Sequence, residues 1–282
     1  VTGDLVIDAG GAVNVNDVGT YGKYPSTCVG SSRCYGRYAG ETGNGNNWGN
    51  GKVFGSIRRP FAYGGAAYIS ENGNGGGAAR LEVEGALLVN GEISSSPKSL
   101  RNAACAPAGG SIWLEVNELK GEGTIIAAGA KDTGSGGNWC GSGGRIAIYM
   151  TGEQAFSEFA GKVRTVNSNS TATTAAGGTV YIQEADETDG QGTLIVDGFG
   201  RSVSYMTALT ALVTDAEDPF GAVIVRNAAK LRLSDGLTLK VIRRLEVSAN
   251  SSVLTEEGGA IEFVGTDDAV FSGGSHVTFQ NF

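Results

Sequence analysis

The chain has 282 residues, of which 47 are glycine, and a formal net charge of −8. Its own field repels polyanions, which argues against nucleic acid as a partner. No apolar run is long enough to cross a bilayer, so we expect no membrane insertion.

The first strand is predicted at Asp4-Leu5-Val6-Ile7, and a long loop rich in aromatic residues follows, from Tyr21 to Tyr63. An aromatic face offers sugar rings a flat apolar surface, and arginine reaches hydroxyl or carboxylate groups. The candidate ligand-binding residues in this loop are Tyr21, Tyr24, Arg33, Tyr35, Arg37, Tyr38 and Trp48, and the loop also carries Arg58 and Arg59. The alternative is that the aromatics fold inward and form the loop's private core.

A phrase of two glycines, one variable residue and an alternating apolar run occurs four times after the loop. The copies start at Gly76, Gly109, Gly143 and Gly177, so they are spaced by 33, 34 and 34 residues. A second apolar phrase follows each copy, introduced by Gly91, Gly123, Gly161 and Gly192. This regularity predicts one short β-unit that stacks on copies of itself.

Only one helical turn is expected, within Glu153–Phe159, where Phe156 and Phe159 lie three residues apart. Beyond Thr214 the pattern predicts short strands of alternating apolar and polar residues, which are separated by turn residues. The expected strands are Ala222–Val225, Lys230–Leu233, Leu237–Val241, Leu245–Val247, Ala260–Val264 and His276–Phe279.

These elements favour an all-β fold, a right-handed parallel β-helix with long glycine-rich loops. A propeller blade needs four strands in about 40–45 residues, and a sandwich has no need of so even a repeat. We expect a single domain over 1–282: N-terminal coils over 1–75 with the aromatic loop 21–63, four repeats over 76–200, and short-strand coils over 201–282. The ends show no polar cap, which predicts a segment of a longer protein.

The four cysteines predict two disulfides. Cys105 and Cys140 precede Gly109 and Gly143 by four and three residues, so they hold nearly equivalent places in successive units. Stacked strands lie about 4.7–4.9 Å apart, which suits the Cα separation of a disulfide, about 4.4–6.8 Å. The remaining pair, Cys28–Cys34, would close a local loop. A zinc site is the rival, but the cysteine spacing does not fit it and His276 is the only histidine. Disulfides indicate an extracellular or cell-surface protein.

Three stretches carry a family resemblance: residues 141–149 (Gly-Ser-Gly-Gly-Arg-Ile-Ala-Ile-Tyr), 109–116 (Gly-Gly-Ser-Ile-Trp-Leu-Glu-Val) and 123–129 (Gly-Thr-Ile-Ile-Ala-Ala-Gly). The chain resembles the glycine-rich repeats of large secreted or surface-attached bacterial proteins with a right-handed parallel β-helix of the pectin-lyase-like type, found in adhesin-like regions. The resemblance implies architecture rather than activity. Its matching residues are glycines and core aliphatics, so no catalytic residue carries over.

Acidic residues gather in three turns: Asp186, Glu187 and Asp189; Asp215, Glu217 and Asp218; and Asp267 and Asp268. Paired carboxylates serve as acid and base in glycoside hydrolysis or bind calcium. No Asn-x-Asp, Gly-His-Gly or Arg-x-Lys companion of β-helical hydrolases is found. We expect solvated turn acids, with calcium as the alternative and no other cofactor or metal.

A basic stripe is the last candidate: Lys230, Arg232, Lys240, Arg243 and Arg244 alternate with apolar residues. It suits a polyuronate or sulfated glycan, or the basic group of a polysaccharide lyase. The alternative is that these side chains keep an outward face soluble and discourage edge pairing.

The predicted function is therefore a non-catalytic structural or adhesive β-helix, secreted or on the cell surface, with its loops as the candidate contact for glycans. The alternatives are a polysaccharide lyase or glycoside hydrolase acting on an acidic glycan, and a self-assembling fibre or matrix subunit. The expected partners are a glycan or a surface protein, and neighbouring segments of a longer chain or further copies of this one.

Overall fold

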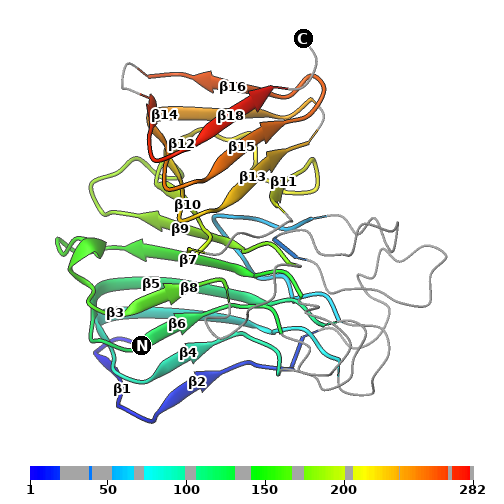
Figure 1. Ribbon diagram of the computed structural model, residues 1–282. Helices are drawn as coiled ribbons and strands as arrows, with labels where there is room; N and C mark the ends of the chain where they lie inside the picture. The colour runs from blue at the N-terminus through cyan, green and yellow to red at the C-terminus, as the bar shows by residue number, and fades with distance from the viewer. Residues whose placement is uncertain are drawn as a thin grey trace.

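A computed structural model describes residues 1–19, 38–39, 53–66, 73–98, 106–130, 141–166, 175–200, 206–234, 236–265 and 269–279. Within these residues the chain is essentially all-β, and its strands stack along one direction from the N-terminus to the C-terminus (Figure 1). All four cysteines lie outside the described residues, and both predicted disulfides lie there with them.

A long sheet of ten strands runs through the whole stack. Nine strands follow one another in hydrogen-bonded order, and the tenth, β17 (Ala269–Phe271), pairs with β14 beside β16. The nine are β1 (Leu5–Ile7), β3 (Ala78–Val89), β5 (Ser111–Lys120), β7 (Arg145–Met150), β9 (Thr179–Gln183), β10 (Thr193–Asp197), β12 (Phe220–Arg226), β14 (Thr238–Val247) and β16 (Ala260–Phe263).

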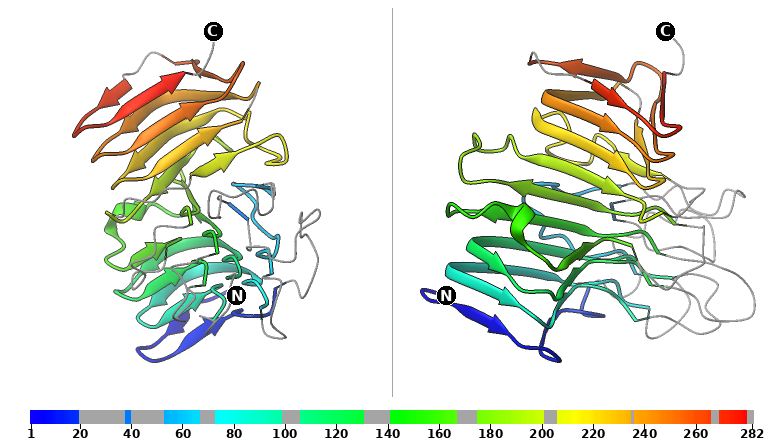
Figure 2. Two further views of the ribbon diagram at one scale, coloured as in Figure 1. Left: turned by 45° about the vertical axis from the view of Figure 1, so that its right-hand side comes forward. Right: turned by 60° about the vertical axis from the view of Figure 1, so that its left-hand side comes forward.

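Two shorter, wholly parallel sheets accompany the long sheet, one in each half of the chain (Figure 2). The first short sheet contains β2 (Ala12–Asn14), β4 (Glu92–Ser94), β6 (Thr124–Ile126) and β8 (Lys162–Arg164). The second short sheet contains β11 (Thr207–Leu209), β13 (Lys230–Leu233), β15 (Ser252–Thr255) and β18 (His276–Phe279). From β3 to β9 and again from β10 to β16, successive strands alternate between the long sheet and one short sheet, an arrangement compatible with a β-helix-like fold.

The register of the long sheet reproduces the spacing of the glycine repeat. Ala78 pairs with Ser111, Ser111 with Arg145, and Arg145 with Thr179, always in parallel. The second apolar phrases of the first three repeats form β4, β6 and β8 in the first short sheet. The first strands of the four repeats therefore pair in parallel at the spacing of the glycine phrase.

The second glycine of each pair forms a column through the stack. A Cβ at Gly110 would overlap the main-chain oxygen of Gly77, one at Gly144 that of Gly110, and one at Gly178 that of Gly144. None of these glycines has a positive φ. The repeated pair is therefore required by the close approach of adjacent coils, not by a left-handed turn.

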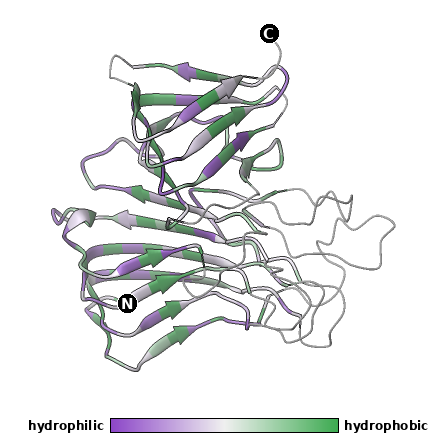
Figure 3. Cartoon of the chain, viewed as in Figure 1, coloured by the Kyte–Doolittle hydropathy of each residue, from purple (hydrophilic) through white to green (hydrophobic). Residues whose placement is uncertain are grey.

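Apolar residues of the first half point to one side of the long sheet and form the first core. Ile112, Leu114 and Val116 on β5 are fully buried there, with Ile146 and Ile148 on β7. Figure 3 shows the resulting succession of apolar and polar residues along many of the strands. The two-residue period of a strand produces this segregation of side chains onto opposite faces.

The stack changes direction at its middle, which corrects the expectation of one uninterrupted parallel β-helix. The second phrase of the fourth repeat forms β10, which pairs antiparallel with β9 instead of joining the first short sheet. Every later strand of the long sheet is then parallel to its neighbour. The second half therefore runs opposite to the first within the same sheet.

The core changes face at the same place. Leu194 on β10 pairs with Tyr181 on β9, and both belong to a second core. Ile195 pairs with Val180, and both pack in the first core. Paired residues share one face of a sheet, whereas neighbours along a strand lie on opposite faces. The two cores therefore lie on opposite faces of the long sheet, and the central strands are buried on both faces.

The predicted C-terminal strands are present, with one difference in their division. The two predicted strands Leu237–Val241 and Leu245–Val247 merge into the single strand β14, which begins at Thr238, and β11, β15 and β17 were not predicted. The expected helical turn is a 3₁₀ turn, η1 (Phe156–Glu158). Phe156 and Phe159 pack against the first core from there.

Residues 53–66, which we call the strap, cover part of the outer face of the first half. The Ser111 hydroxyl donates to the carbonyl of Ala62 at 2.6 Å, and Tyr149 donates to that of Arg58 at 2.9 Å. Val53 and Ile57 are buried in the second core. The strap thus extends the second core over strands that belong to the first half.

Candidate functional site

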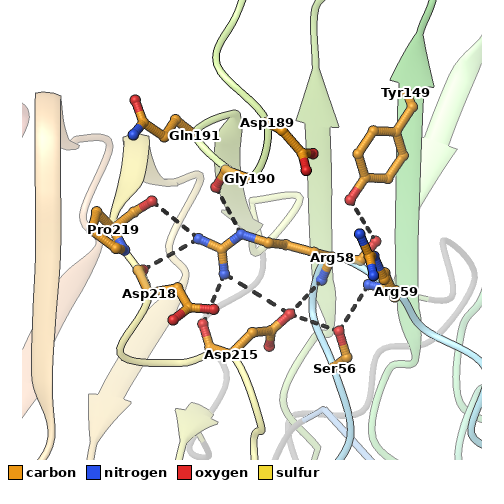
Figure 4. Close-up of a pocket in the computed structure, with 10 residues that line it drawn as sticks. All are labelled: Ser56, Arg58, Arg59, Tyr149, Asp189, Gly190, Gln191, Asp215, Asp218 and Pro219. Carbon is orange, nitrogen blue, oxygen red and sulfur yellow. Dashed lines mark hydrogen bonds and ion pairs between the residues drawn. The ribbon is translucent and has the colours of Figure 1, made fainter.

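A pocket of about 480 Å³ lies where the strap, the β9–β10 turn and the segment before β12 meet. Figure 4 shows its lining, with the side chain of Arg58 crossing the centre. The lining residues are Ser56, Arg58, Arg59, Tyr149, Asp189, Gly190, Gln191, Asp215, Asp218 and Pro219. Its volume is in the range of small-molecule sites, about 300–1,000 Å³.

The carboxylate of Asp215 anchors the strap at the floor of this pocket. It accepts a hydrogen bond from the Ser56 hydroxyl at 2.6 Å and from the backbone N–H groups of Ile57 and Arg58, each at 2.9 Å. Asp215 is only 8% exposed. The expectation that all turn acids are solvated is wrong for this residue, because its carboxylate is buried and accepts hydrogen bonds from the strap.

The guanidinium of Arg58 joins the three segments around the pocket. It donates to the carbonyls of Gly190 and Asp215, both at 2.8 Å, and to those of Asp218 and Pro219, both at 3.2 Å. Its Nη1 lies 3.9 Å from Oδ2 of Asp215, and its Cζ lies 4.0 Å from the centroid of the Phe220 ring. These partners satisfy a guanidinium that is only 6% exposed, so Arg58 positions the pocket and is not free for a ligand.

A second buried arginine, Arg145 at the start of β7, holds the beginning of the strap. It donates to the carbonyl of Phe54 at 3.0 Å and to the hydroxyl of Thr179 at 3.0 Å. Burial lowers its pKa, and the nearby phenol of Tyr38 opposes that shift. Arg145 occupies the variable position of the glycine repeat, which gives no sign of this role in the sequence.

The β9–β10 turn is fixed by a chain of side-chain hydrogen bonds. The Tyr181 hydroxyl accepts from the N–H of Gly192 at 2.8 Å and donates to Oε1 of Gln183 at 2.9 Å. The same Gln183 oxygen accepts from the N–H of Gly190 at 2.8 Å. Gly190 has a φ of 77°, which favours glycine at this position. The turn therefore presents Asp189 and Gln191 to the pocket in a defined place.

Tyr149 forms one wall, in a row of aromatic rings across the sheet. Its centroid lies 6.4 Å from that of Trp113 and 5.7 Å from that of Tyr181. Burial raises the pKa of its phenol above the usual range, and the charges of Tyr181 and Asp189 act in the same direction, whereas Arg58 and Arg59 oppose it. Tyr149 is therefore a neutral donor and apolar wall at any physiological pH.

Most of the predicted ligand-binding residues lie outside the described part of the chain: Tyr21, Tyr24, Arg33, Tyr35, Arg37 and Trp48. The remaining one, Tyr38, is fully buried, with its hydroxyl 2.8 Å from that of Ser111. Burial raises the pKa of Tyr38, and Arg145 opposes that shift. Tyr38 thus has the inward role of the alternative reading, whereas Phe61 and Tyr63 of the same loop are 74% and 49% exposed.

Two candidate sets that the sequence presents separately meet in this pocket. Arg58 and Arg59 come from the aromatic loop, and Asp189, Asp215 and Asp218 come from two of the acidic turns. Asp267 and Asp268, from the third turn, lie outside the described residues. Sequence reasoning missed Ser56, Tyr149 and Gln191. Tyr149 does occupy the outward position between the core residues Ile148 and Met150, which is the one available signal.

The predicted basic stripe is divided between two sheets. Lys230 and Arg232 lie on β13 in the second short sheet, whereas Lys240, Arg243 and Arg244 lie on β14 in the long sheet. Three of the arginines are paired with carboxylates: Arg232 with Glu256, Arg243 with Glu187 and Arg244 with Glu246. The structure therefore does not assemble the stripe into one cationic surface. His276 on β18 is exposed.

A second pocket, of about 590 Å³, lies between the segment before η1 and the segment after β9. Glu184 lines it and accepts hydrogen bonds from the N–H of Phe156 at 3.1 and 3.2 Å. Burial raises the pKa of Glu184, the Phe156 N–H opposes the shift, and the charges of Glu187, Asp186 and Glu158 add to it.

Within the described ranges, no group of three or more His, Cys, Asp or Glu side chains is arranged to hold a metal ion. The same ranges contain no helix with the length and apolar character of a membrane span. Comparison of the chain with protein-family models, with curated proteins and with solved structures finds no match.

Proposed function

We propose that this chain is a non-catalytic structural or adhesive protein of the cell exterior that binds glycans at the pocket beneath the strap. We further propose that each half winds as a right-handed parallel β-helix of the pectin-lyase-like type. The parallel registers at the repeat spacing support that winding. The two stacks share the central strands, whose residues contribute to both cores.

The observation that carries the binding proposal is the set of polar groups left over at the pocket. The side chains of Arg58 and Asp215 are buried and hydrogen-bonded within the protein, whereas those of Arg59, Asp189 and Asp218 are exposed. Together with Gln191 they provide donors and acceptors beside the ring of Tyr149. Sugars are bound by such a combination of directed hydrogen bonds and an aromatic wall.

Binding is favoured over catalysis by the state of the candidate acid and base groups. Asp215, the buried carboxylate of the pocket, accepts from three separate donors and lies beside Arg58, so it has no free role in proton transfer. Arg243 and Arg244, which a lyase would need as cations at its substrate, are paired with Glu187 and Glu246. The buried carboxylate of the pocket and these two arginines are therefore committed to other partners, which favours binding over catalysis.

The proposal is tested with a panel of oligosaccharides from pectin, alginate, sulfated galactans, mucin and chitosan, measured by titration calorimetry. Arg59→Gln should weaken the binding of a recognised glycan about tenfold, the worth of about one hydrogen bond. Lys162→Gln, an exposed change far along the first short sheet, is the matched control and should have no effect.

Two results would contradict the proposal. If no oligosaccharide in the panel binds, the glycan-binding function is wrong. If any substrate releases reducing ends or unsaturated products, the protein is an enzyme and the non-catalytic assignment is wrong. The self-assembling alternative is supported by exposed apolar side chains on and near the last strands, namely Phe263, Val264, Val270 and Phe271. It predicts a molar mass that rises with protein concentration.

A further inference from the structure

The charges that line the pocket do not balance. Arg58 and Asp215 neutralise each other in an ion pair at 3.9 Å, and both are buried. The remaining charged side chains of the lining are one cation, Arg59, and two carboxylates, Asp189 and Asp218. A ligand at this site therefore meets an excess of one negative charge, in a chain that already carries a net charge of −8.

Neither of these two carboxylates has a side-chain hydrogen bond or ion pair to any described residue, although neighbouring acids of the same region do. Glu187 is paired with Arg243, and Asp197 with Arg226. The fourfold donation by Arg58 goes to main-chain carbonyls, including that of Asp218, and leaves the Asp218 carboxylate free. Figure 4 shows Asp189 and Asp218 on opposite sides of the Arg58 guanidinium, both at the pocket.

We propose that the pocket binds a glycan through a sugar that carries a free, positively charged amino group. This inference rests on the proposed glycan-binding function and names the ligand class. An ammonium group has three donors and no acceptor, which suits a carboxylate with unused lone pairs, and the pocket offers one on each side of Arg58. Arg59 and Gln191 serve the ring hydroxyls, and Tyr149 forms the apolar wall. A uronate would instead bring a third carboxylate to a site with one available cation, and the field of the whole chain would oppose its approach.

The experiment compares three tetrasaccharides of equal length: glucosamine with free amines, its fully N-acetylated form, and galacturonate. Binding is measured by calorimetry at a pH at which the amines are protonated and the aspartates ionised, at low and at high salt. The free-amine form should bind about tenfold more tightly than the acetylated one, and the difference should shrink with salt because it is electrostatic.

Asp189→Asn and Asp218→Asn test the assignment of the two carboxylates. Each substitution should lower the affinity for the free-amine tetrasaccharide about tenfold, to near the affinity for the acetylated form. The affinity for the acetylated form should hardly change. Asp8→Asn, an exposed acid beyond β1, is the matched control and should change neither. An unfolding midpoint equal to that of the parent chain shows that each variant is folded.

The possible outcomes separate this inference from the function on which it rests. Equal affinities for the three tetrasaccharides, or a preference for galacturonate, overturn the amino-sugar assignment and leave glycan binding in place. Equal binding of a tetralysine peptide and the free-amine sugar also overturns it, because the site then recognises charge without sugar. Absence of binding to every oligosaccharide in the wider panel contradicts the proposed function itself.

Discussion

Two buried arginines connect parts of the chain that lie far apart in sequence. Arg58, on the strap, donates to four carbonyls in the β9–β10 turn and in the segment before β12. Arg145, on β7, donates to the carbonyl of Phe54 on the strap. A guanidinium suits this role because its five donors have a fixed planar geometry and it stays charged when buried. The shape of the pocket thus depends on single side chains more than on any one strand.

Replacement of Arg58 by lysine should destabilise the protein strongly. The ammonium group cannot reach four carbonyls at once, and it leaves the buried Asp215 carboxylate incompletely paired. Breaking a buried pair costs about 3–5 kcal/mol, and we expect a loss near the lower end, about 3 kcal/mol, because the charge is kept. Chemical denaturation measures the change. Arg80→Lys, whose guanidinium is half-exposed beside Glu82 and Glu115, is the control and should cost under about 1 kcal/mol. Equal effects of the two changes would show that Arg58 does not organise the pocket.

Glu184 should make stability depend on pH. Its pKa is raised in the folded protein, above all by burial, so folding disfavours its ionised form. The folded state then holds more protons than the unfolded state between the two pKa values, and the free energy of unfolding falls as pH rises through the folded pKa. Glu184→Gln keeps an acceptor for the N–H of Phe156 and should remove this fall.

The measurement is a set of unfolding curves from the ordinary pKa of a glutamate, about 4.3, up to neutral pH. The parent chain should lose stability relative to Glu184→Gln across that interval and gain it back on acidification. Glu122→Gln, at an exposed glutamate between β5 and β6, should run parallel to the parent curve. A parallel curve for Glu184→Gln as well would mean that Glu184 does not titrate abnormally.

Among the strands, the glycine column explains why the repeat is so strict. Adjacent coils of the long sheet approach until the main-chain oxygen of one glycine fills the place of the next glycine's Cβ, from Gly77 through Gly110 and Gly144 to Gly178. The strand ladders continue through this point, since Arg145 N–H donates to the carbonyl of Gly110 at 2.9 Å. The repeated glycines therefore serve the packing of one strand of the long sheet on the next.

Gly144→Ala should therefore be severely destabilising. The new methyl group meets backbone, which cannot rotate away as a side chain can, and overpacking of a close contact costs about 3 kcal/mol or more. Thermal unfolding or failure of soluble expression detects the effect. Gly3→Ala is the matched control, because a Cβ there has no atom within 4 Å and should be neutral. A neutral Gly144→Ala would show that neighbouring coils have room to separate.

For the molecule as a whole, the reversal between β9 and β10 is the central feature. It moves the core from one face of the long sheet to the other, and it leaves the outer face of the first half partly apolar, with Trp113, Ala147 and Tyr149 on it. The second core and the strap cover that face. The two halves are therefore not independent stacks, because the central strands belong to both cores.

A chain that ends after residue 198 should consequently associate. It keeps the first core but exposes Tyr181 and Leu194, and it removes Asp215, the anchor of the strap. Exposed apolar surface of this kind leads to self-association, which light scattering after size-exclusion chromatography measures. A chain that ends after residue 265 loses only β17 and β18 and should retain the size distribution of the parent. A monomeric, cooperatively folding 1–198 fragment would contradict the shared-core description.

Local patterns were enough to predict the strands and much of their stacking, because a two-residue period and a fixed repeat act over short distances. The equal spacing from Gly109 to Gly143 already specifies the pairing of Ser111 with Arg145. The same patterns also singled out Arg58, Arg59, Asp189, Asp215 and Asp218 as charged groups of interest. None of them indicated that these residues from separate segments would meet.

Three-dimensional packing alone decided the reversal at β10, the change of core face and the pocket. The fourth repeat carries the same phrase as the first three, so nothing local distinguishes a strand that joins the first short sheet from one that folds back on β9. That choice depends on which apolar face is buried by distant parts of the chain. Here Leu194 and Tyr181 lie on one face and are buried in the second core, together with residues of the strap. Burial of Asp215 follows from it, because a turn acid is solvated until a distant backbone segment supplies its donors.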